Sequence, residues 1–174
     1  MRRVLTTPCE RKIPPGTEGN HFYLLLFDGG PRGNPGPGGS GTVVAKVARG
    51  TGVYTICWVS SMSYASRTTT NNIAENMGLL MGLRARHRNW WTPMQVIGDC
   101  RIIIHQQKTR TLPKATHLTS LYRRSRRLAD MLNVTGWNHH RRAHNKMADA
   151  LANMAVDSRR SVQRHIMGID SVTS

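Results

Sequence analysis

The sequence predicts an α/β fold built on a mixed sheet, in which an antiparallel meander is followed by parallel strands and flanking helices. Two observations support this fold. Three β-type segments separated by turn residues come first, and helical patterns then alternate with short apolar strands. A chain of 174 residues is expected to form one domain. We place that domain at 21–157, between a flexible leader over 1–20 and a basic polar tail over 158–174.

The first three predicted strands form the meander. Segment 22–27 is aliphatic or aromatic at every position, which is typical of a strand buried on both faces. Asp28 follows it and opens a loop that consists mostly of glycine and proline, the residues of tight turns. Segments 41–47 and 53–59 are rich in β-formers, and the Arg-Gly-Thr-Gly run at 49–52 between them predicts a hairpin.

The second half of the chain predicts helices around two further strands. A helix should begin at Asn71 or Asn72, either of which is a good N-cap, and end near Arg86. Strand 94–99 should lie parallel to strand 22–27, because a helical crossover separates the two. The other predicted elements are helices over 101–107 and 115–132, a strand over 134–138, and a last helix that Asn145 caps and that ends near Val156.

The composition indicates a polyanionic partner. The formal net charge is +16, and 20 of the 25 basic residues other than histidine are arginine, the better bidentate ligand for phosphate. Nucleic acid is the first expectation, and an anionic membrane is a distant second. Three widely spaced cysteines and the lack of a membrane-length apolar run indicate an intracellular protein with no disulfide framework, in nucleus or cytoplasm.

Four of the nine acidic residues stand out by position. Asp28 and Asp99 end two strands that should be neighbours, Glu75 lies near the start of a helix, and Asp149 lies in the first turn of another. If they converge, their like charges repel, and the cluster requires cations at neutral pH. Oxygen ligands select Mg²⁺, with Mn²⁺ as a substitute, and two such ions about 4 Å apart are suited to phosphodiester chemistry.

Four motifs, taken in their order along the chain, resemble those of type 1 ribonuclease H. The resemblance is to the compact form of the family, which lacks an extra basic helix for substrate binding and which includes proteins related to retroelements. The motifs are Asp-Gly-Gly at 28–30 with Gly-Asn-Pro-Gly-Pro-Gly-Gly at 33–39, Thr-Thr-Asn-Asn-Ile-Ala-Glu at 69–75, Ile-Gly-Asp at 97–99, and His-Asn-Lys-Met-Ala-Asp at 144–149. The resemblance covers about residues 22–157. It implies a five-stranded mixed sheet flanked by helices, and cleavage of the RNA strand of RNA/DNA hybrids by two metal ions.

The resemblance also implies roles for single residues. The metal ligands and catalytic acids carry over to Asp28, Glu75, Asp99 and Asp149. Contacts to the RNA minor groove, where only RNA offers a 2′-hydroxyl, carry over to Gly29, Asn34, Asn71 and Asn72.

The chain departs from the family pattern at three places. Segment 108–115 leaves no room for the basic helix that serves some members as a substrate handle, so the arginines of 115–132 are candidates to replace it. Arg101 stands where the family often has glutamine, and there it offers a phosphate ligand. His144 lies on a short connection, which restricts any catalytic role it has.

Two other functions fit the same residues. One is a catalytically weak or inactive module that binds hybrid or structured RNA, and the other is a different nuclease or an integrase on the same fold. A zinc site at His139, His140 and His144 is disfavoured because no cysteine lies nearby. A monomer is the favoured oligomeric state.

Overall fold

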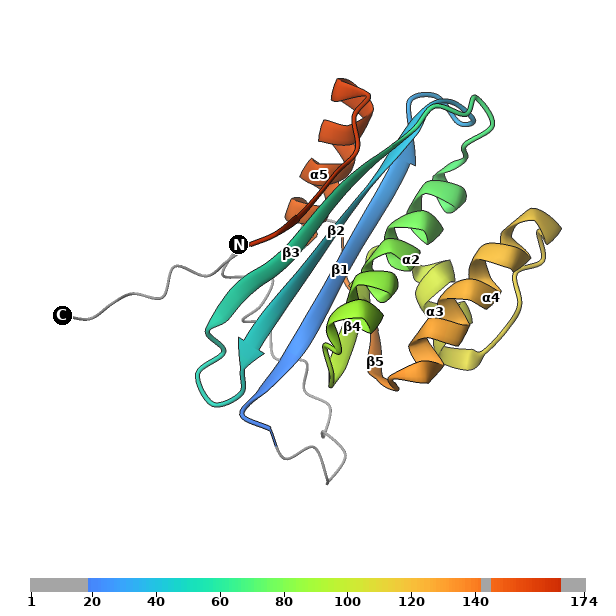
Figure 1. Ribbon diagram of the computed structural model, residues 1–174. Helices are drawn as coiled ribbons and strands as arrows, with labels where there is room; N and C mark the ends of the chain where they lie inside the picture. Colours follow the sequence, from blue (N-terminus) through green and yellow to red (C-terminus); the bar gives the residue numbers. More distant parts are fainter. Residues whose placement is uncertain (1–18, 142–144, 167–174) are drawn as a thin grey trace.

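The computed structural model describes residues 19–141 and 145–166, which form one mixed sheet with helices on both faces (Figure 1). The sheet has six strands in the order β5-β4-β1-β2-β3-β6. The strands are β1 His21–Pro31, β2 Gly38–Ala48, β3 Tyr54–Tyr64, β4 Met94–Gly98, β5 Val134–His139 and β6 Val162–His165. The helices are α2 Asn71–Asn89, α3 Arg101–Thr109, α4 Thr116–Met131 and α5 Lys146–Ser158.

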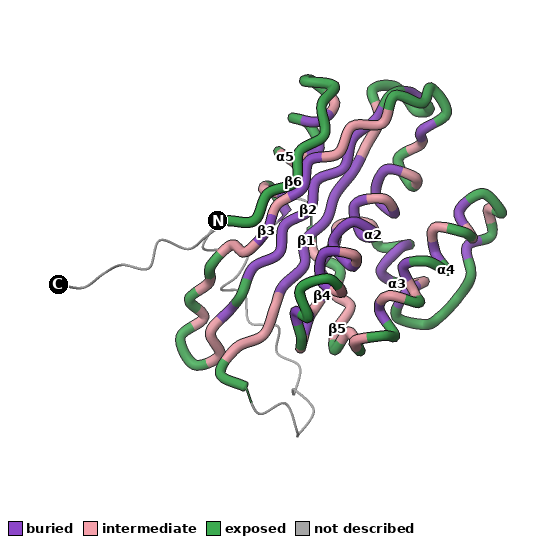
Figure 2. The backbone as a smooth tube through the Cα atoms, in the orientation of Figure 1, coloured by how far each residue is buried: buried purple, intermediate pink, exposed green. Residues whose placement is uncertain are grey.

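The expected antiparallel meander and the expected parallel pairing of the first strand with the fourth are confirmed. β1 pairs antiparallel with β2 and parallel with β4, and β4 pairs parallel with β5. The prediction of five strands is wrong, because β6 pairs antiparallel with β3 at the sheet edge (Figure 2). β6 lies in the segment expected to be a polar tail, and its four residues are all exposed, so no apolar periodicity marked it.

The two faces of the sheet have separate cores. Alternate residues of β1 divide between them: Leu25 and Phe27 pack toward α2, whereas Leu24 and Leu26 pack in the cluster that includes Ala148 of α5. α4 packs against α2, outside the sheet, while α5 covers β1, β2 and β3 on the opposite face (Figure 1). β1 is therefore buried on both sides along its middle, as its apolar run predicted.

The N-cap of α2 is Thr70, so the expectation of Asn71 or Asn72 is wrong. The Thr70 hydroxyl accepts a hydrogen bond from the Ile73 backbone N–H at 3.3 Å, and Asn71 and Asn72 are exposed in the first turn. Threonine is also a good N-cap, and a Thr-Thr-Asn-Asn run gives the sequence no way to choose among its members. The two asparagine side chains are therefore available at the surface.

Helix α5 lies so close to β2 that two β2 positions tolerate only glycine. A Cβ built at Gly41 would lie 2.0 Å from the Ala148 carbonyl oxygen and 2.6 Å from the Ala152 backbone nitrogen. A Cβ at Gly39 would lie 2.6 Å from the Ala152 carbonyl oxygen. This contact sets the height of α5 above the sheet, and therefore the position of every side chain that α5 directs toward β1.

None of the helices in the described part of the chain is both long enough and apolar enough to cross a bilayer.

We expect Gly41→Ala to destabilise the fold, because the added methyl group overlaps backbone atoms of α5 that cannot move alone. The cost should be about 1–3 kcal/mol or more in free energy of unfolding. Gly50→Ala is the matched control, since a Cβ at Gly50 meets no atom within 4 Å. Thermal unfolding of the two variants measures the difference, and equal melting temperatures would contradict the close packing of α5 on β2.

Candidate active site

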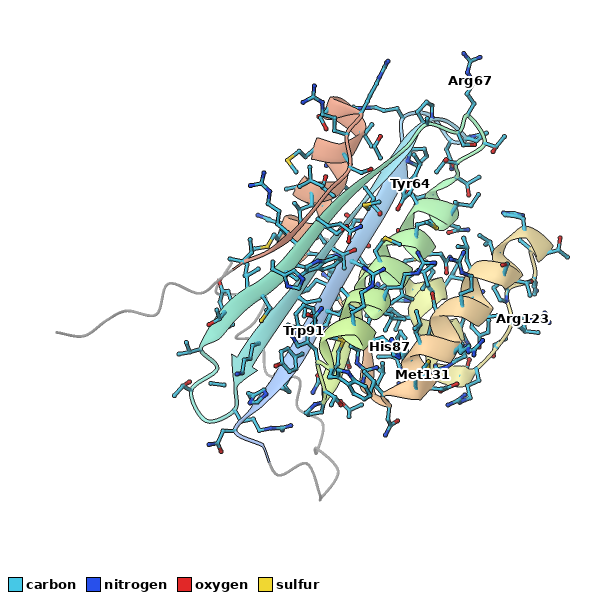
Figure 3. The ribbon with its side chains drawn as sticks, in the orientation of Figure 1. Tyr64, Arg67, His87, Trp91, Arg123 and Met131 are labelled. Carbon is cyan, nitrogen blue, oxygen red and sulfur yellow. The ribbon has the colours of Figure 1, made fainter. Side chains whose placement is uncertain are left out.

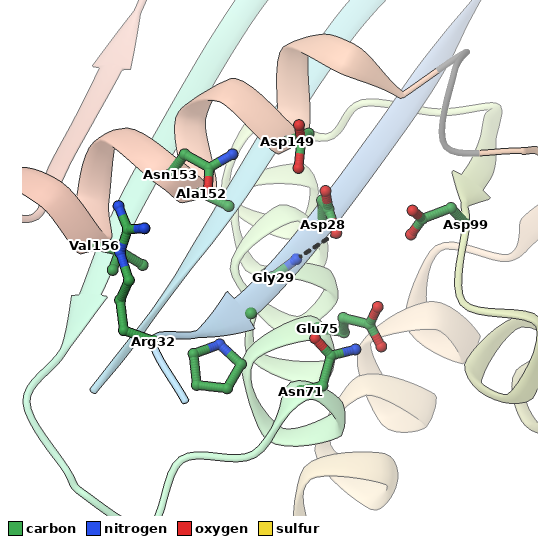
Figure 4. Close-up of a pocket in the computed structure, with 12 residues that line it drawn as sticks. Asp28, Gly29, Arg32, Asn71, Glu75, Asp99, Asp149, Ala152, Asn153 and Val156 are labelled. Atoms are coloured by element: carbon green, nitrogen blue, oxygen red, sulfur yellow. Dashed lines mark hydrogen bonds between the residues drawn. The ribbon is translucent and has the colours of Figure 1, made fainter. Parts of the chain in front are cut away.

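A cavity of about 270 Å³ opens where β1, β4, α2 and α5 meet (Figure 4). Four acidic side chains line it, together with residues from the end of β1, the start of the β1–β2 loop, the first turn of α2, and α5. The lining residues are Asp28, Gly29, Gly30, Pro31, Arg32, Asn71, Glu75, Asp99, Asp149, Ala152, Asn153 and Val156. All four acids that the sequence singled out therefore lie in one place.

The sheet register brings Asp28 and Asp99 together. The last parallel pair between β1 and β4 is Phe27 with Gly98, and each aspartate is the next residue of its chain. Because parallel strands keep the same direction, both carboxylates leave the sheet at the same edge. β1 itself continues to Pro31 by pairing with β2, so Asp28 lies within a strand and is only 4% exposed.

Glu75 reaches the same point from α2. It is only 6% exposed, because this helix packs against both the sheet and α4 and is buried nearly all round. The approach depends on Gly29, where a Cβ would lie 2.4 Å from the Ala74 carbonyl carbon. Carboxylate oxygens of Asp28, Glu75 and Asp99 all lie within 4.8 Å of one another, a spacing that could hold a metal ion.

Cys100 contacts this group from the N-terminus of α3. Burial is the main cause that raises the pKa of its thiol to about 12, and the Glu75 carboxylate, which accepts a hydrogen bond from the thiol, contributes to the rise. The thiol is therefore protonated at neutral pH and acts as a donor to Glu75.

Asp149 enters the cavity from α5, next to Asp28 (Figure 4). It does not belong to the group of three within 4.8 Å. Asn145 fixes the start of its helix: the Asn145 side chain is 1% exposed, and its Nδ2 donates to the Phe27 carbonyl at 2.7 Å. The Asn145 carbonyl in turn accepts from the Asp149 N–H at 3.1 Å. Two hydrogen bonds thus connect β1 to Asp149. Asn145 is the N-cap residue as expected, but its side chain does not cap the helix.

The electrostatics of the site favour a neutral Asp28 in the absence of cations. The pKa of Asp28 is raised to about 7, with burial as the largest cause and the charge of Asp99 as the next. The Gly29 N–H donates to Asp28 Oδ1 at 2.8 Å and lowers the pKa, while Asp149 raises it. The cost of ionising this carboxyl is what a bound cation would offset.

The residues expected to contact substrate divide between two places. Gly29 and Asn71 line the acidic cavity, whereas Asn72 and Arg101 line a neighbouring groove of about 560 Å³ formed with α3 and the chain before α4. Asn34 lies in neither lining. Its Oδ1 accepts a hydrogen bond from the Asn71 N–H at 3.3 Å, so it holds the β1–β2 loop against the start of α2.

His144 lies outside the described residues, as does its neighbour Arg142. Sequence reasoning gave no site role to Arg32 and Asn153 in the cavity lining, to Asn145 behind Asp149, or to Cys100 beside Glu75. Asn153 could have been found, because it lies one helical turn after Asp149.

The chain matches a family model described as Reverse transcriptase-like over residues 26–155. A ribonuclease H of Bordetella bronchiseptica is 32% identical over 158 aligned residues, which cover 78% of this chain and 90% of that relative. This chain belongs to the type 1 ribonuclease H family. A bifunctional protein of Mycobacterium tuberculosis is 34% identical over 135 residues, or 78% of this chain. The chain spans only 35% of the length of that protein.

Solved ribonuclease H structures have the same fold. The N-terminal ribonuclease H domain of the Mycobacterium tuberculosis protein superposes with a TM-score of 0.68 at 33% identity, covering 78% of this chain and 94% of that one. LC11-RNase H1, solved in complex with an RNA/DNA hybrid, superposes with a TM-score of 0.69 at 25% identity, covering 79% of this chain and 98% of that one.

We expect the metal-free protein to lose stability as the pH rises from about 4 to about 7. The pKa of Asp28 is about 7 in the folded protein, whereas the ordinary value for an aspartate, which the unfolded chain should have, is 3.8. The folded state therefore binds this proton more tightly. That contribution is complete at low pH and disappears as the pH passes the folded pKa. Asp28→Asn should flatten the dependence and raise the melting temperature at pH 8 by on the order of 5 °C.

Thermal unfolding in EDTA across this pH range tests the expectation. Asp130→Asn is a contrasting control: a hydrogen bond from Arg110 lowers the pKa of this exposed carboxyl, so its loss should slightly lower stability at pH 8. A melting temperature of the unmutated protein that does not change between pH 4 and pH 7 would contradict the raised pKa of Asp28.

Proposed function

We propose that this protein is an endoribonuclease that cleaves the RNA strand of RNA/DNA hybrids with two divalent metal ions. The observation that carries the proposal is the convergence of Asp28, Glu75 and Asp99 within 4.8 Å, at an open cavity of a chain with net charge +16. Family membership and the hybrid-bound LC11-RNase H1 support the same reaction and the same substrate class.

The donor set fits Mg²⁺, with Mn²⁺ as an alternative. The three clustered ligand residues and Asp149 all offer carboxylate oxygens, the ligands that hard divalent cations prefer. The burial of Asp28 and the charge of Asp99 make the metal-free cluster costly to ionise, and cations would remove that cost. Asp28 lies between Asp149 and Asp99 in the cavity, so we assign it to both ion positions (Figure 4).

Metal ions in such a site activate a water molecule and neutralise charge on the phosphate. Side chains of the protein would hold these ions in position. Glu75 and Asp99 would hold the ion near the attacking water and the scissile phosphate, and Asp149 would hold the other. A hydrogen bond from the Cys100 thiol would help to orient the Glu75 carboxylate. The hydrogen bonds through Asn145 fix Asp149 relative to β1.

Selection of RNA is assigned to the loop and helix start beside the acids. Gly29 and Asn71 line the cavity itself, and Asn34 holds Asn71 in place, so polar groups lie next to the strand that is cut. Only RNA offers a 2′-hydroxyl to them. Asn72 and Arg101, in the adjoining groove, would contact the neighbouring backbone, where Arg101 offers a charge to phosphate.

A module that only binds nucleic acid has no need for four acids in one cavity. Carboxylates repel phosphate, so each one reduces affinity unless a cation is bound. The convergence of all four therefore favours a nuclease over a binding module.

We expect Asp28→Asn or Asp99→Asn to reduce hybrid cleavage by roughly a thousandfold or more, because each removes a charged metal ligand. Hybrid affinity should be unchanged or higher, since phosphate repulsion falls. The assay follows cleavage of a labelled RNA/DNA hybrid with and without Mg²⁺, and uses duplex RNA and duplex DNA as parallel substrates. It measures both the substrate specificity and the loss of cleavage activity in each variant. Asp130→Asn, an acid outside the cavity, is the control and should keep most activity. Robust cleavage by either site variant would refute the metal assignment.

Exposed arginines of α4 should contribute to hybrid affinity. Arg123, Arg124 and Arg127 are exposed, and Arg123 points away from the sheet (Figure 3). Changing these three residues together to Gln should weaken binding and reduce the slope of log affinity against log salt by up to about 2.7, or 0.9 per phosphate contact. Turnover at saturation should change little. Binding titrations between 50 and 200 mM salt provide the measurement, and an unchanged slope would place the phosphate contacts on another surface.

A further inference from the structure

Among the residues that the structure describes, Arg32 is the one cationic residue in the lining of the acidic cavity. It comes from the β1–β2 loop, and it lies at the end of the cavity away from Asp99 (Figure 4). The amide of Asn153 lies on the Arg32 side of Asp149, and the amide of Asn71 lies beside Glu75 (Figure 4). The cavity is therefore negative at one end and positive at the other.

Hydrogen bonds within and beyond the loop fix the backbone of Arg32. Its own N–H donates to the Pro37 carbonyl at 2.8 Å. The Gly36 N–H donates to the Thr69 carbonyl at 2.9 Å, and Asn34 accepts from the Asn71 N–H. The loop is thus attached at two points to the segment that starts α2. The backbone of Arg32 is therefore held in place, whereas its long side chain can change conformation and exchange one binding partner for another.

The partner of Arg32 in this structure is exposed. Its guanidinium forms an ion pair with Asp157 near the end of α5, and the two side chains are 66% and 59% exposed. Ion pairs this exposed are weak, because water and salt screen them. A phosphate is a better ligand for a guanidinium, since it accepts two parallel hydrogen bonds and carries more charge. A phosphate entering the cavity would displace Asp157.

We propose that Arg32 binds a backbone phosphate of the RNA strand next to the scissile one, and that Asp157 holds Arg32 when no substrate is bound. This inference rests on the proposed function, which places the scissile phosphate at the acids. The cleaved strand then continues along the cavity, and its adjacent phosphate requires a cation. Arg32 supplies that cation, and α5, through Asp157, controls its availability.

The test compares Arg32→Gln, Asp157→Asn and the double variant. Binding of a labelled RNA/DNA hybrid is measured in the Asp99→Asn background with Mg²⁺, so that affinity is read without cleavage. Arg32→Gln should weaken binding about three- to tenfold and reduce the salt slope by about 0.9. Asp157→Asn should tighten binding about two- to fivefold, because it removes the competing carboxylate. The double variant should bind as Arg32→Gln does.

Two patterns would overturn the proposal. If both single variants weaken binding equally, the pair only attaches the loop to α5. If Asp157→Asn tightens binding as much in the Arg32→Gln background, the gain comes from net charge alone. Arg164→Gln, on the exposed edge strand β6, is the control for the loss of one positive charge away from the cavity. If this variant loses as much hybrid affinity as Arg32→Gln does, the phosphate subsite at Arg32 is also refuted.

The proposed function can fail separately. If the unmutated protein binds hybrid but does not cleave it with Mg²⁺, the nuclease assignment fails, and the binding cycle still decides the role of Arg32. If the unmutated protein does not bind hybrid at all, both proposals are wrong.

Discussion

The burial of Asp28 among other carboxylates is the constraint on which the rest of this structure depends. Asp28 is 4% exposed, Glu75 is 6% exposed, and oxygens of these two residues and Asp99 lie within 4.8 Å of one another. An arrangement of like charges in a partly buried site does not form by mutual attraction. Packing elsewhere must therefore hold these side chains together. The free energy comes from the two hydrophobic cores, which pack against opposite faces of β1.

Close contacts between backbones supply this packing. Gly29 lets α2 approach until Glu75 reaches the strand, and Gly41 lets α5 approach from the other face until Asp149 does. Asn145 adds a buried hydrogen bond from α5 to the Phe27 carbonyl, one residue before Asp28. The rigidity of these attachments explains how four elements far apart in the sequence can direct acids into one small cavity.

The parts of the site that could be predicted from the sequence are those fixed by strand order. Asp28 and Asp99 each follow an apolar run, so parallel pairing of those runs was enough to bring them together. Thr70 could not be distinguished from the asparagines after it, because all are good caps. β6 has no apolar pattern, and only its pairing with β3 makes it a strand. Arg32 gave no signal either, because its position in the cavity depends on how the loop folds against α2.

The net charge of +16 overstates the charge available for phosphate. Arg86 is fully buried, where burial lowers its pKa to about 10, and it donates to the Trp91 and Leu132 carbonyls. Arg126 is bonded to Asp130 and to the Gln107 carbonyl, and it also lies over the Trp137 ring. Both are structural residues that connect helices to loops. Phosphate contacts must then come from arginines whose guanidinium groups face solvent or an exposed partner. Arg32 at the cavity meets this condition, and so do the exposed arginines of α4, so we expect hybrid affinity to come both from the cavity and from a surface outside it.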